Sequence, residues 1–144
     1  MIIGIPKERR PNEKRVGLSP AGVQLLTERG HTCFVEDQAG RGAGFRNIKY
    51  EKAGAKIAFS AEEVFGRSDL LLKMARPMMD EIEWLRPDSA FAAFLHLASA
   101  RQDKLDLLVE KNITAIAYEQ IQEDDEVRPV LRPLSQIGGV MAAQ

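Results

Sequence analysis

Cysteine is nearly absent from this chain of 144 residues, which contains only Cys33. A single cysteine excludes a disulfide framework and a thiolate metal site. Cys33 lies in an apolar stretch, which is typical of an inert buried thiol, and the lack of disulfides favours a reducing, cytoplasmic location. No apolar run approaches the roughly 20 residues of a membrane span. The net charge of −1 gives no electrostatic argument for binding nucleic acid or an anionic membrane.

Several motifs that identify enzyme chemistry are also missing. The sequence contains no P-loop, no spacing typical of metal ligands, and no paired nucleophile and base. The glycine-rich stretch Gly40–Phe45 is similar to a dinucleotide-binding loop but departs from it in two ways. Its third glycine comes one position early, and the next helical pattern begins only near Ile48. We therefore expect a turn with several residues at positive φ.

What the chain does contain is a regular alternation of short apolar runs and helical patterns. Its 144 residues, 44% of them hydrophobic, are enough for one domain with its own core. Strands separated by helices of this length form βαβ crossovers, so we predict an α/β fold on a mostly parallel sheet. The predicted strands are Ile2–Ile5, Thr32–Glu36, Lys56–Ala58, Leu70–Lys73, Ala90–Phe94 and Thr114–Ala117. The predicted helices are Pro20–Arg29, Ile48–Ala53, Ala61–Phe65, Met79–Leu85, Arg101–Lys111 and a last one that opens at Leu134 and continues to Gln144.

Four cationic or ionisable side chains follow predicted strands. Arg15 belongs to a highly charged loop after the first strand, and Lys73, Arg76 and His96 lie at the ends of later strands. Open α/β sheets place ligand contacts at the carboxyl ends of their strands, so these residues are candidates for one pocket that binds a small carboxylate or oxo acid. Arg15 and His96 each have a plain structural alternative as well. A charge cluster is usually solvated, and a lone histidine is usually a core or edge residue.

The order of these segments resembles the amino-terminal domain shared by alanine dehydrogenases and the alpha subunits of proton-translocating NAD(P) transhydrogenases. The resemblance extends over essentially the whole chain with near-family spacing. The matching stretches are Ile3-Gly4-Ile5-Pro6-Lys7-Glu8, Asn12-Glu13-Lys14-Arg15-Val16, Ser19-Pro20-Ala21-Gly22-Val23, Ala39-Gly40 through Gly44-Phe45, Tyr50, Ala53-Gly54-Ala55, Asp69-Leu70-Leu71-Leu72-Lys73, Leu95-His96-Leu97-Ala98, Ala117-Tyr118-Glu119 and Pro133-Leu134-Ser135.

This resemblance implies a fold and an activity. Alanine dehydrogenases interconvert L-alanine and pyruvate with NAD, release ammonia, and assemble as hexamers or dimers. They have two Rossmann-like domains with the active site in the cleft between them. Residues 1–144 would form the substrate-side domain, and the NAD-binding domain is not part of this sequence. The predicted fold class is therefore α/β, Rossmann-like or flavodoxin-like, with a mostly parallel sheet and helices on both faces. The expected partners are a small-molecule substrate and further copies of the chain, with no membrane.

The resemblance also suggests roles for single residues. The family arginine that matches Arg15 binds the substrate carboxylate, and the histidine that matches His96 acts as a hydrogen-bond donor and acid/base catalyst. The serine that matches Ser135 lies near the cofactor NAD. Lys73 and Arg76 join them as substrate-binding candidates because of their position at a strand end.

Two departures keep other functions open. Alanine dehydrogenases usually carry a second lysine two residues after the one that matches Lys73, and here Ala75 occupies that position. Transhydrogenases also lack this lysine, but they typically replace the His96-Leu97 pair by Trp-Pro. The alternatives are therefore a transhydrogenase alpha-subunit domain and a relative that binds oxo acids without catalysis.

Overall fold

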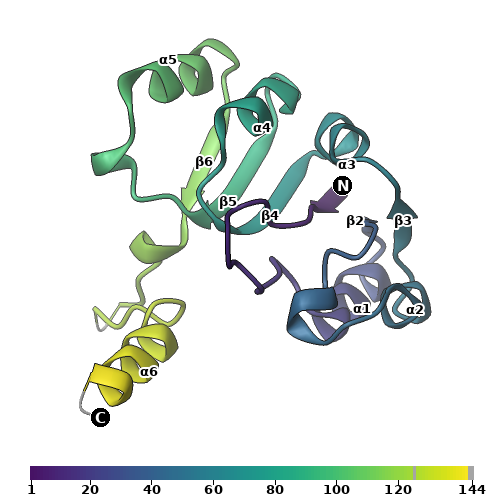
Figure 1. Cartoon of the computed structure of the whole chain (residues 1–144). Helices are drawn as coiled ribbons and strands as arrows, with labels where there is room; N and C mark the ends of the chain where they lie inside the picture. Colours follow the sequence, from purple (N-terminus) through teal and green to yellow (C-terminus); the bar gives the residue numbers. More distant parts are fainter. Residues whose placement is uncertain (125, 143–144) are drawn as a thin grey trace.

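One parallel sheet of six strands forms the centre of the molecule. The computed structural model describes residues 1–124 and 126–142, and Figure 1 shows their arrangement. The strand order is β3-β2-β1-β4-β5-β6, and every neighbouring pair is parallel. This is the strand order of a Rossmann fold, so the predicted fold class is confirmed. The strands are β1 Ile2–Ile5, β2 Thr32–Glu36, β3 Lys56–Ala58, β4 Leu70–Ala75, β5 Ala90–Phe94 and β6 Thr114–Ala117.

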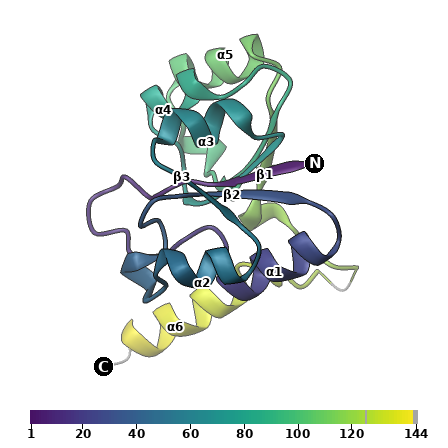
Figure 2. The same ribbon diagram turned by 90° about the vertical axis from the view of Figure 1, so that its right-hand side faces the viewer.

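Helices cover both faces of the sheet, as Figure 2 shows. On one face lie α1 (Pro20–Glu28) and α2 (Asn47–Lys52). On the other lie α3 (Ala61–Arg67), α4 (Met79–Trp84) and α5 (Gln102–Glu110). Each face buries its own hydrophobic cluster, because parallel strands between two helix layers are apolar on both sides.

All the predicted strands and helices are present, with ends that differ by at most two residues. The last helix is α6 (Arg132–Ala142), and residues 143 and 144 of its predicted range lie outside the described residues. In Figure 1 this helix extends away from the sheet. Its side chains Ile137, Val140 and Met141 are exposed. No helix within residues 1–124 and 126–142 is both long enough and apolar enough to cross a membrane.

Local sequence signals explain where the elements begin and end. The hydroxyl of Ser19 accepts a hydrogen bond from the amide of Gly22 and caps α1, whose first residue is Pro20. The stretch Gly40–Phe45 forms a single 3-10 turn that ends at Gly44 with φ of 81°. The prediction of a turn in place of a dinucleotide loop is therefore confirmed, but the expectation of several residues at positive φ is wrong, since within this stretch Gly44 alone has a positive φ.

The strand order reverses at β1, which has β2 on one side and β4 on the other. Ligands of open α/β sheets bind outside the carboxyl ends of the strands at such a point. The loop that follows β1 returns across β4 and approaches it closely at Gly17. A Cβ atom at Gly17 would lie 2.9 Å from the backbone nitrogen of Lys73 and closer still to the carbonyl of Leu72.

We expect Gly17→Ala to destabilise the chain by about 1–3 kcal/mol, because the added methyl meets fixed backbone of β4. The matched control is Gly66→Ala, since a Cβ at this helical glycine meets no atom within 4 Å. The control should stabilise the chain by about 0.5–1 kcal/mol through helix propensity. Urea unfolding of both variants measures the difference, and equal effects at the two glycines would contradict the close approach.

Candidate active site

Arg15 presents a guanidinium that is already paired with a carboxylate. Its Nε donates to Glu13 Oε1 at 2.8 Å and its Nη2 to Glu13 Oε2 at 2.6 Å. The hydrogen bonds from Arg15 lower the pKa of Glu13, and those to Glu13 raise the pKa of Arg15. The Arg15 side chain is still 48% exposed. It lines a hollow of about 280 Å³ between the loop after β1 and the segment Gln38–Gly42 after β2.

Lys73 is enclosed by carboxylates and does not face this hollow. Its side chain is 1% exposed, and its Nζ lies 2.6 Å from Glu81 Oε1 and 3.3 Å from Glu8 Oε2. Glu81 Oε2 also accepts the amide of Met78, which precedes α4. The arrangement gives Lys73 an internal charge-pairing role; a direct contact with substrate stays a prediction.

The two carboxylate oxygens of Glu8 have different environments in this network. Its Oε1 accepts the amide of Met74 at 2.7 Å, whereas its buried Oε2 makes no hydrogen bond within the described residues. Burial raises the pKa of Glu8, and the positive charge of Lys73 only partly opposes this effect. Two buried carboxylates around one ammonium would leave a net negative charge, so protonation of Glu8 relieves the excess.

His96 lies just beyond β5 in a left-handed conformation with φ of 48°. Glu119, from the 3-10 turn after β6, accepts the amide of Leu95 at 3.1 Å and the amide of His96 at 2.6 Å. Burial tends to raise the pKa of Glu119, but the backbone N–H donors together lower it. The imidazole Nδ1 lies 4.0 Å from Glu119 Oε1, and the His96 side chain is 59% exposed. The backbone of His96 is thus fixed while its ring remains open to solvent.

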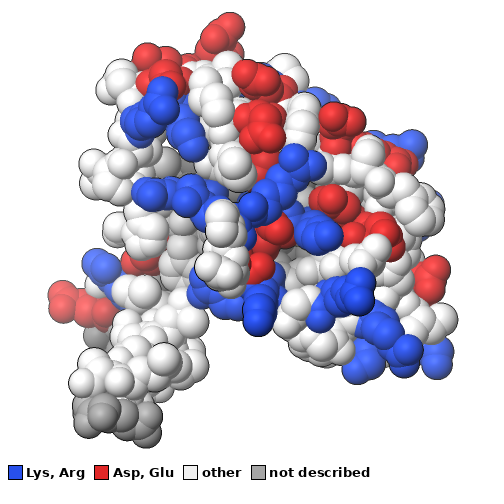
Figure 3. Space-filling view, in the orientation of Figure 1, with Lys and Arg blue, Asp and Glu red and all other residues white. Residues whose placement is uncertain are grey.

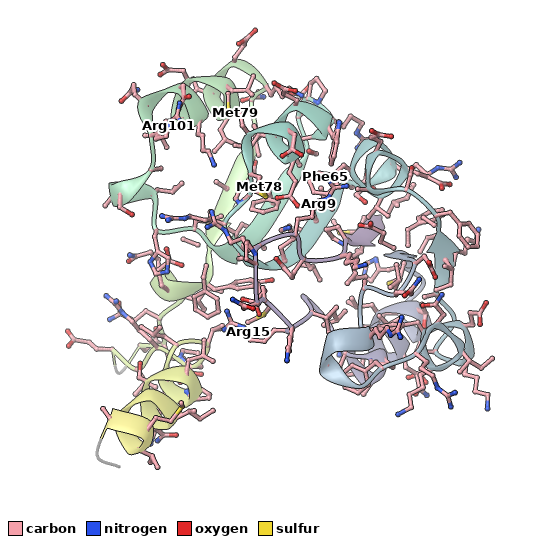
Figure 4. All side chains as sticks on the ribbon, in the orientation of Figure 1. Arg9, Arg15, Phe65, Met78, Met79 and Arg101 are labelled. Carbon is pink, nitrogen blue, oxygen red and sulfur yellow. The ribbon has the colours of Figure 1, made fainter. Side chains whose placement is uncertain are left out.

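The other two predicted residues, Arg76 and Ser135, do not line the hollow of Arg15. Arg76 follows β4, and its Nη1 approaches Ser99 Oγ at 3.5 Å. Ser135 is exposed in the first turns of α6 and lines a shallow surface depression with Arg128 and Arg132. Figure 4 shows Arg15 at the loop after β1, far from Arg101 at the start of α5.

All the substrate-side candidates thus lie at the carboxyl ends of β1, β4 and β5, on one edge of the sheet. No hydrogen bond or ion pair in residues 1–124 and 126–142 joins any two of Arg15, Lys73, Arg76 and His96. Three of them are paired with glutamates instead. The described part of the chain also holds no group of three or more His, Cys, Asp or Glu side chains placed to bind a metal ion.

Comparison with known proteins decides the family. The family described as Alanine dehydrogenase/PNT, N-terminal domain, matches residues 4–138. The chain belongs to this family. Over the whole chain it is 42% identical to an alanine dehydrogenase of Staphylococcus saprophyticus and 40% identical to one of Mycobacterium tuberculosis. The chain spans 38% of the length of each of these relatives.

Solved structures give the same result for this alanine dehydrogenase/PNT domain. One solved L-alanine dehydrogenase superposes with a TM-score of 0.89 at 40% identity, over 94% of this chain and 37% of that one. The transhydrogenase from Sinorhizobium meliloti superposes with a TM-score of 0.77 at 31% identity, over 83% of this chain and 35% of that one. Both branches of the family therefore share the fold described above.

Sequence reasoning missed the acidic partners in this domain. Glu13 could have been found, because it lies two residues before Arg15 in one loop. Glu8 and Glu119 bind groups 23 to 66 residues away, and Glu81 binds Lys73 eight residues away, so no local pattern identifies these contacts, whereas the bond of Glu81 to the amide of Met78 is local. The only signal was the charge of Lys73 at the end of an apolar run, since a lysine there needs a buried counter-ion.

We expect the stability of the wild-type chain, relative to Glu8→Gln, to fall as pH rises above about 4.3, the ordinary pKa of a glutamate. Because the pKa of Glu8 is raised in the fold, the folded state keeps this proton to a higher pH than the unfolded state. The stability that the proton contributes is present below the unfolded pKa and is lost as pH rises through the folded pKa. Urea unfolding of both proteins between about pH 4 and 7 measures the difference.

The control for this series is Glu110→Gln, because Glu110 is exposed at the end of α5. Its stability relative to the wild type should not change with pH in this range. If the stability of the wild type relative to Glu8→Gln instead rose with pH, the pKa of Glu8 in the folded state would be lowered. That result would contradict the proposed charge arrangement around Lys73.

We expect Glu119→Ala to cost about 2–4 kcal/mol of stability, because the amides of Leu95 and His96 both lose their acceptor. Amide hydrogen exchange at Leu95 and His96 should be faster in Glu119→Ala than in the wild type, because both amides lose their hydrogen-bond acceptor. Glu119→Gln keeps one acceptor oxygen and should lose less. Glu110→Ala is the matched control at an exposed glutamate. An equal loss of stability in the two alanine variants would contradict the inference that Glu119 holds the backbone at His96.

Proposed function

We propose that the chain is the substrate-binding part of an NAD-dependent alanine dehydrogenase, which converts L-alanine to pyruvate and ammonia by oxidative deamination. The observation that carries the proposal is the exposed guanidinium of Arg15, which lines a hollow between the loops that follow β1 and β2. The curated relatives named alanine dehydrogenase, at 40% and 42% identity, support it.

Arg15 suits a carboxylate because its donors form a rigid planar fork. Glu13 uses Nε and Nη2 and leaves the Nη1 donors available to a second anion. Glu13 also fixes the plane of the guanidinium before any substrate arrives. The substrate carboxylate therefore either joins Glu13 on Arg15 or displaces it.

His96 is the proposed acid/base group. The Glu119 carboxylate fixes the backbone at His96, and the imidazole extends into solvent beyond β5. A histidine exchanges protons near neutral pH, and in its donor form it polarises a carbonyl oxygen. These properties suit the interconversion of an amino acid and its 2-oxo acid.

Lys73 and Arg76 remain proposed contributors to substrate binding. Lys73 lies directly behind the loop of Arg15, and its positive charge sits between Glu8 and Glu81. Arg76 is exposed and carries a cation one residue beyond Ala75.

NAD supplies the hydride acceptor of this reaction when it is bound. The described part of this chain contains no glycine-rich loop that opens a helix, so the proposed contribution to NAD is limited to the exposed Ser135 with Arg128 and Arg132 beside it. The protein is further proposed to work in the cytoplasm as a homo-oligomer. The reduced, buried thiol of Cys33 is consistent with that location.

A second candidate function is that of a transhydrogenase alpha-subunit domain. Ala75 favours it, since it stands where alanine dehydrogenases usually have a lysine, and the superposition on a transhydrogenase at 31% identity supports it. In this case Arg15 and His96 are structural, and hydride passes between two nucleotides without an amino acid.

In the protein that contains this chain together with its nucleotide domain, we expect Arg15→Ala to lower kcat/KM for L-alanine by on the order of 10²–10³. Most of the loss should be in KM, because Arg15 holds a carboxylate that is present in both the ground state and the transition state. Steady-state assays of alanine oxidation and pyruvate amination measure it.

Arg46→Gln is the control, because Arg46 is exposed and lies outside the hollow of Arg15. Its kcat/KM should equal that of the wild type. Normal alanine oxidation by Arg15→Ala would overturn the assignment of Arg15. Hydride transfer between nucleotides with no alanine oxidation in the wild type would establish the second function instead.

A further inference from the structure

A separate cavity lies between α4, α5 and the strands beneath them. Its volume is about 140 Å³. Ile82 of α4, Phe91 of β5, and Leu105 and Leu108 of α5 form an apolar interior. No residue that lines it also lines the hollow of Arg15. We call it the α4–α5 cavity.

Four cations surround the opening of this cavity: Arg10, Arg76, Arg101 and Lys104. Figure 3 shows Lys and Arg side chains crossing this face of the molecule. Arg101 has a carboxylate partner, since its Nη2 lies 2.5 Å from Asp103 Oδ2. No acidic side chain lines the cavity.

The other three cations bind only neutral oxygens in the described structure. Arg10 Nε donates to the carbonyl of Arg76 at 3.2 Å, and Lys104 Nζ donates to the carbonyl of Pro77 at 3.0 Å. Arg76 reaches the hydroxyl of Ser99. Burial lowers the pKa of Lys104, and the positive charges of Arg10, Arg76 and Arg101 lower it further. The opening therefore carries excess positive charge, which an anion would neutralise.

We propose that the α4–α5 cavity binds a small carboxylate that carries one aryl or branched alkyl group. The apolar group fills the interior between Ile82, Phe91 and Leu108, and the carboxylate lies among the cations at the opening. An apolar cavity of about 150 Å³ holds one benzene molecule, so the size suits a single ring or a branched chain. A guanidinium or ammonium beside it then selects an acid over a neutral molecule.

This cavity is separate from the hollow of Arg15 in the proposed function, although Arg76, a proposed contributor there, borders it. Arg15 binds its carboxylate in a hollow of polar and charged side chains, whereas this cavity selects for an apolar group. Leu95 and Leu97 line the cavity and flank His96 in the chain. An occupant therefore contacts both neighbours of His96, which gives the cavity a route to influence the proposed catalytic group.

The test is a titration of the chain with phenylacetate, followed by NMR of its leucine methyl groups. We expect saturable shifts at Leu95, Leu97, Leu105 and Leu108, with a Kd on the order of 1 mM for a ligand of this size. Methyl groups of Val16 and Leu18, in the loop of Arg15, should not shift. Phenylacetamide lacks the charge and acetate lacks the ring, so each should bind at least about tenfold more weakly.

Three variants separate the parts of the proposal. Lys104→Gln should weaken phenylacetate binding about fivefold or more by removing one cation at the opening. Ala115→Leu should abolish it by placing a larger side chain in the wall, at an exposed position of β6 that tolerates the change. Arg46→Gln removes an equal charge outside the cavity and should bind like the wild type.

Three outcomes would overturn the proposal. The first is the absence of a saturable shift. The second is equal binding of phenylacetamide, which would show an apolar cavity without selection for an anion. The third is a shift confined to the loop of Arg15, which would show binding in the other hollow. None of these measurements depends on dehydrogenase activity, so the proposed function stands or falls separately.

Discussion

The buried ion network of Lys73, Glu8 and Glu81 is the constraint on which the carboxyl edge of the sheet depends. It joins the loop after β1, the end of β4 and the first turn of α4 at one point. A charge this deep is tolerated only with its partners, and removal of Lys73, which would leave two buried carboxylates unpaired, costs about 3–5 kcal/mol. Glu8 also accepts a hydrogen bond from the amide of Met74 in β4. If the loop after β1 moved away from β4, Lys73 and the amide of Met74 would both lose Glu8 as a partner. Arg15 lies seven residues after Glu8 in the same loop, so the contacts of Glu8 with Lys73 and Met74 help to fix the position of Arg15.

Pairing with glutamate then distinguishes the two groups of cations on this edge. Arg15 and Lys73 each have a carboxylate partner at hydrogen-bond distance, so their geometry exists before a ligand binds, whereas Glu119 fixes only the backbone of His96. Such preorganisation reduces the ordering that binding would otherwise require. Arg10, Arg76 and Lys104 have only carbonyl or hydroxyl partners in the described structure, so no carboxylate offsets their positive charge. The residues paired with glutamate suit recognition of a ligand in a fixed geometry. Arg10, Arg76 and Lys104 suit attraction of an anion, and the apolar α4–α5 cavity then selects the anion by its shape.

The fold was predictable from the sequence because its signals are local. Apolar runs such as Thr32–Glu36 alternate with capped helices, and parallel strands buried on both faces need that pattern. The site was predictable only in part. The strand ends placed Arg15, Lys73 and His96 on one edge, but the burial of Lys73 depends on Glu8 and Glu81, which only the folded chain brings to it. The sequence of a lysine at a strand end is the same whether the lysine binds substrate or is buried among carboxylates. Only the tertiary contacts decide between these two environments.

The position of Ala75 follows from the same geometry and bears on the proposed chemistry. β4 pairs regularly with β5 from Leu70 to Leu72, and its register shifts before Ala75. The next residue, Arg76, leaves the strand and reaches Ser99 beside the α4–α5 cavity. In this structure the charge of Arg76 therefore lies at the α4–α5 cavity and outside the hollow of Arg15. In the proposed dehydrogenase, polarisation of the substrate carbonyl then falls to His96, whose backbone is held by Glu119 and whose ring is exposed at this edge.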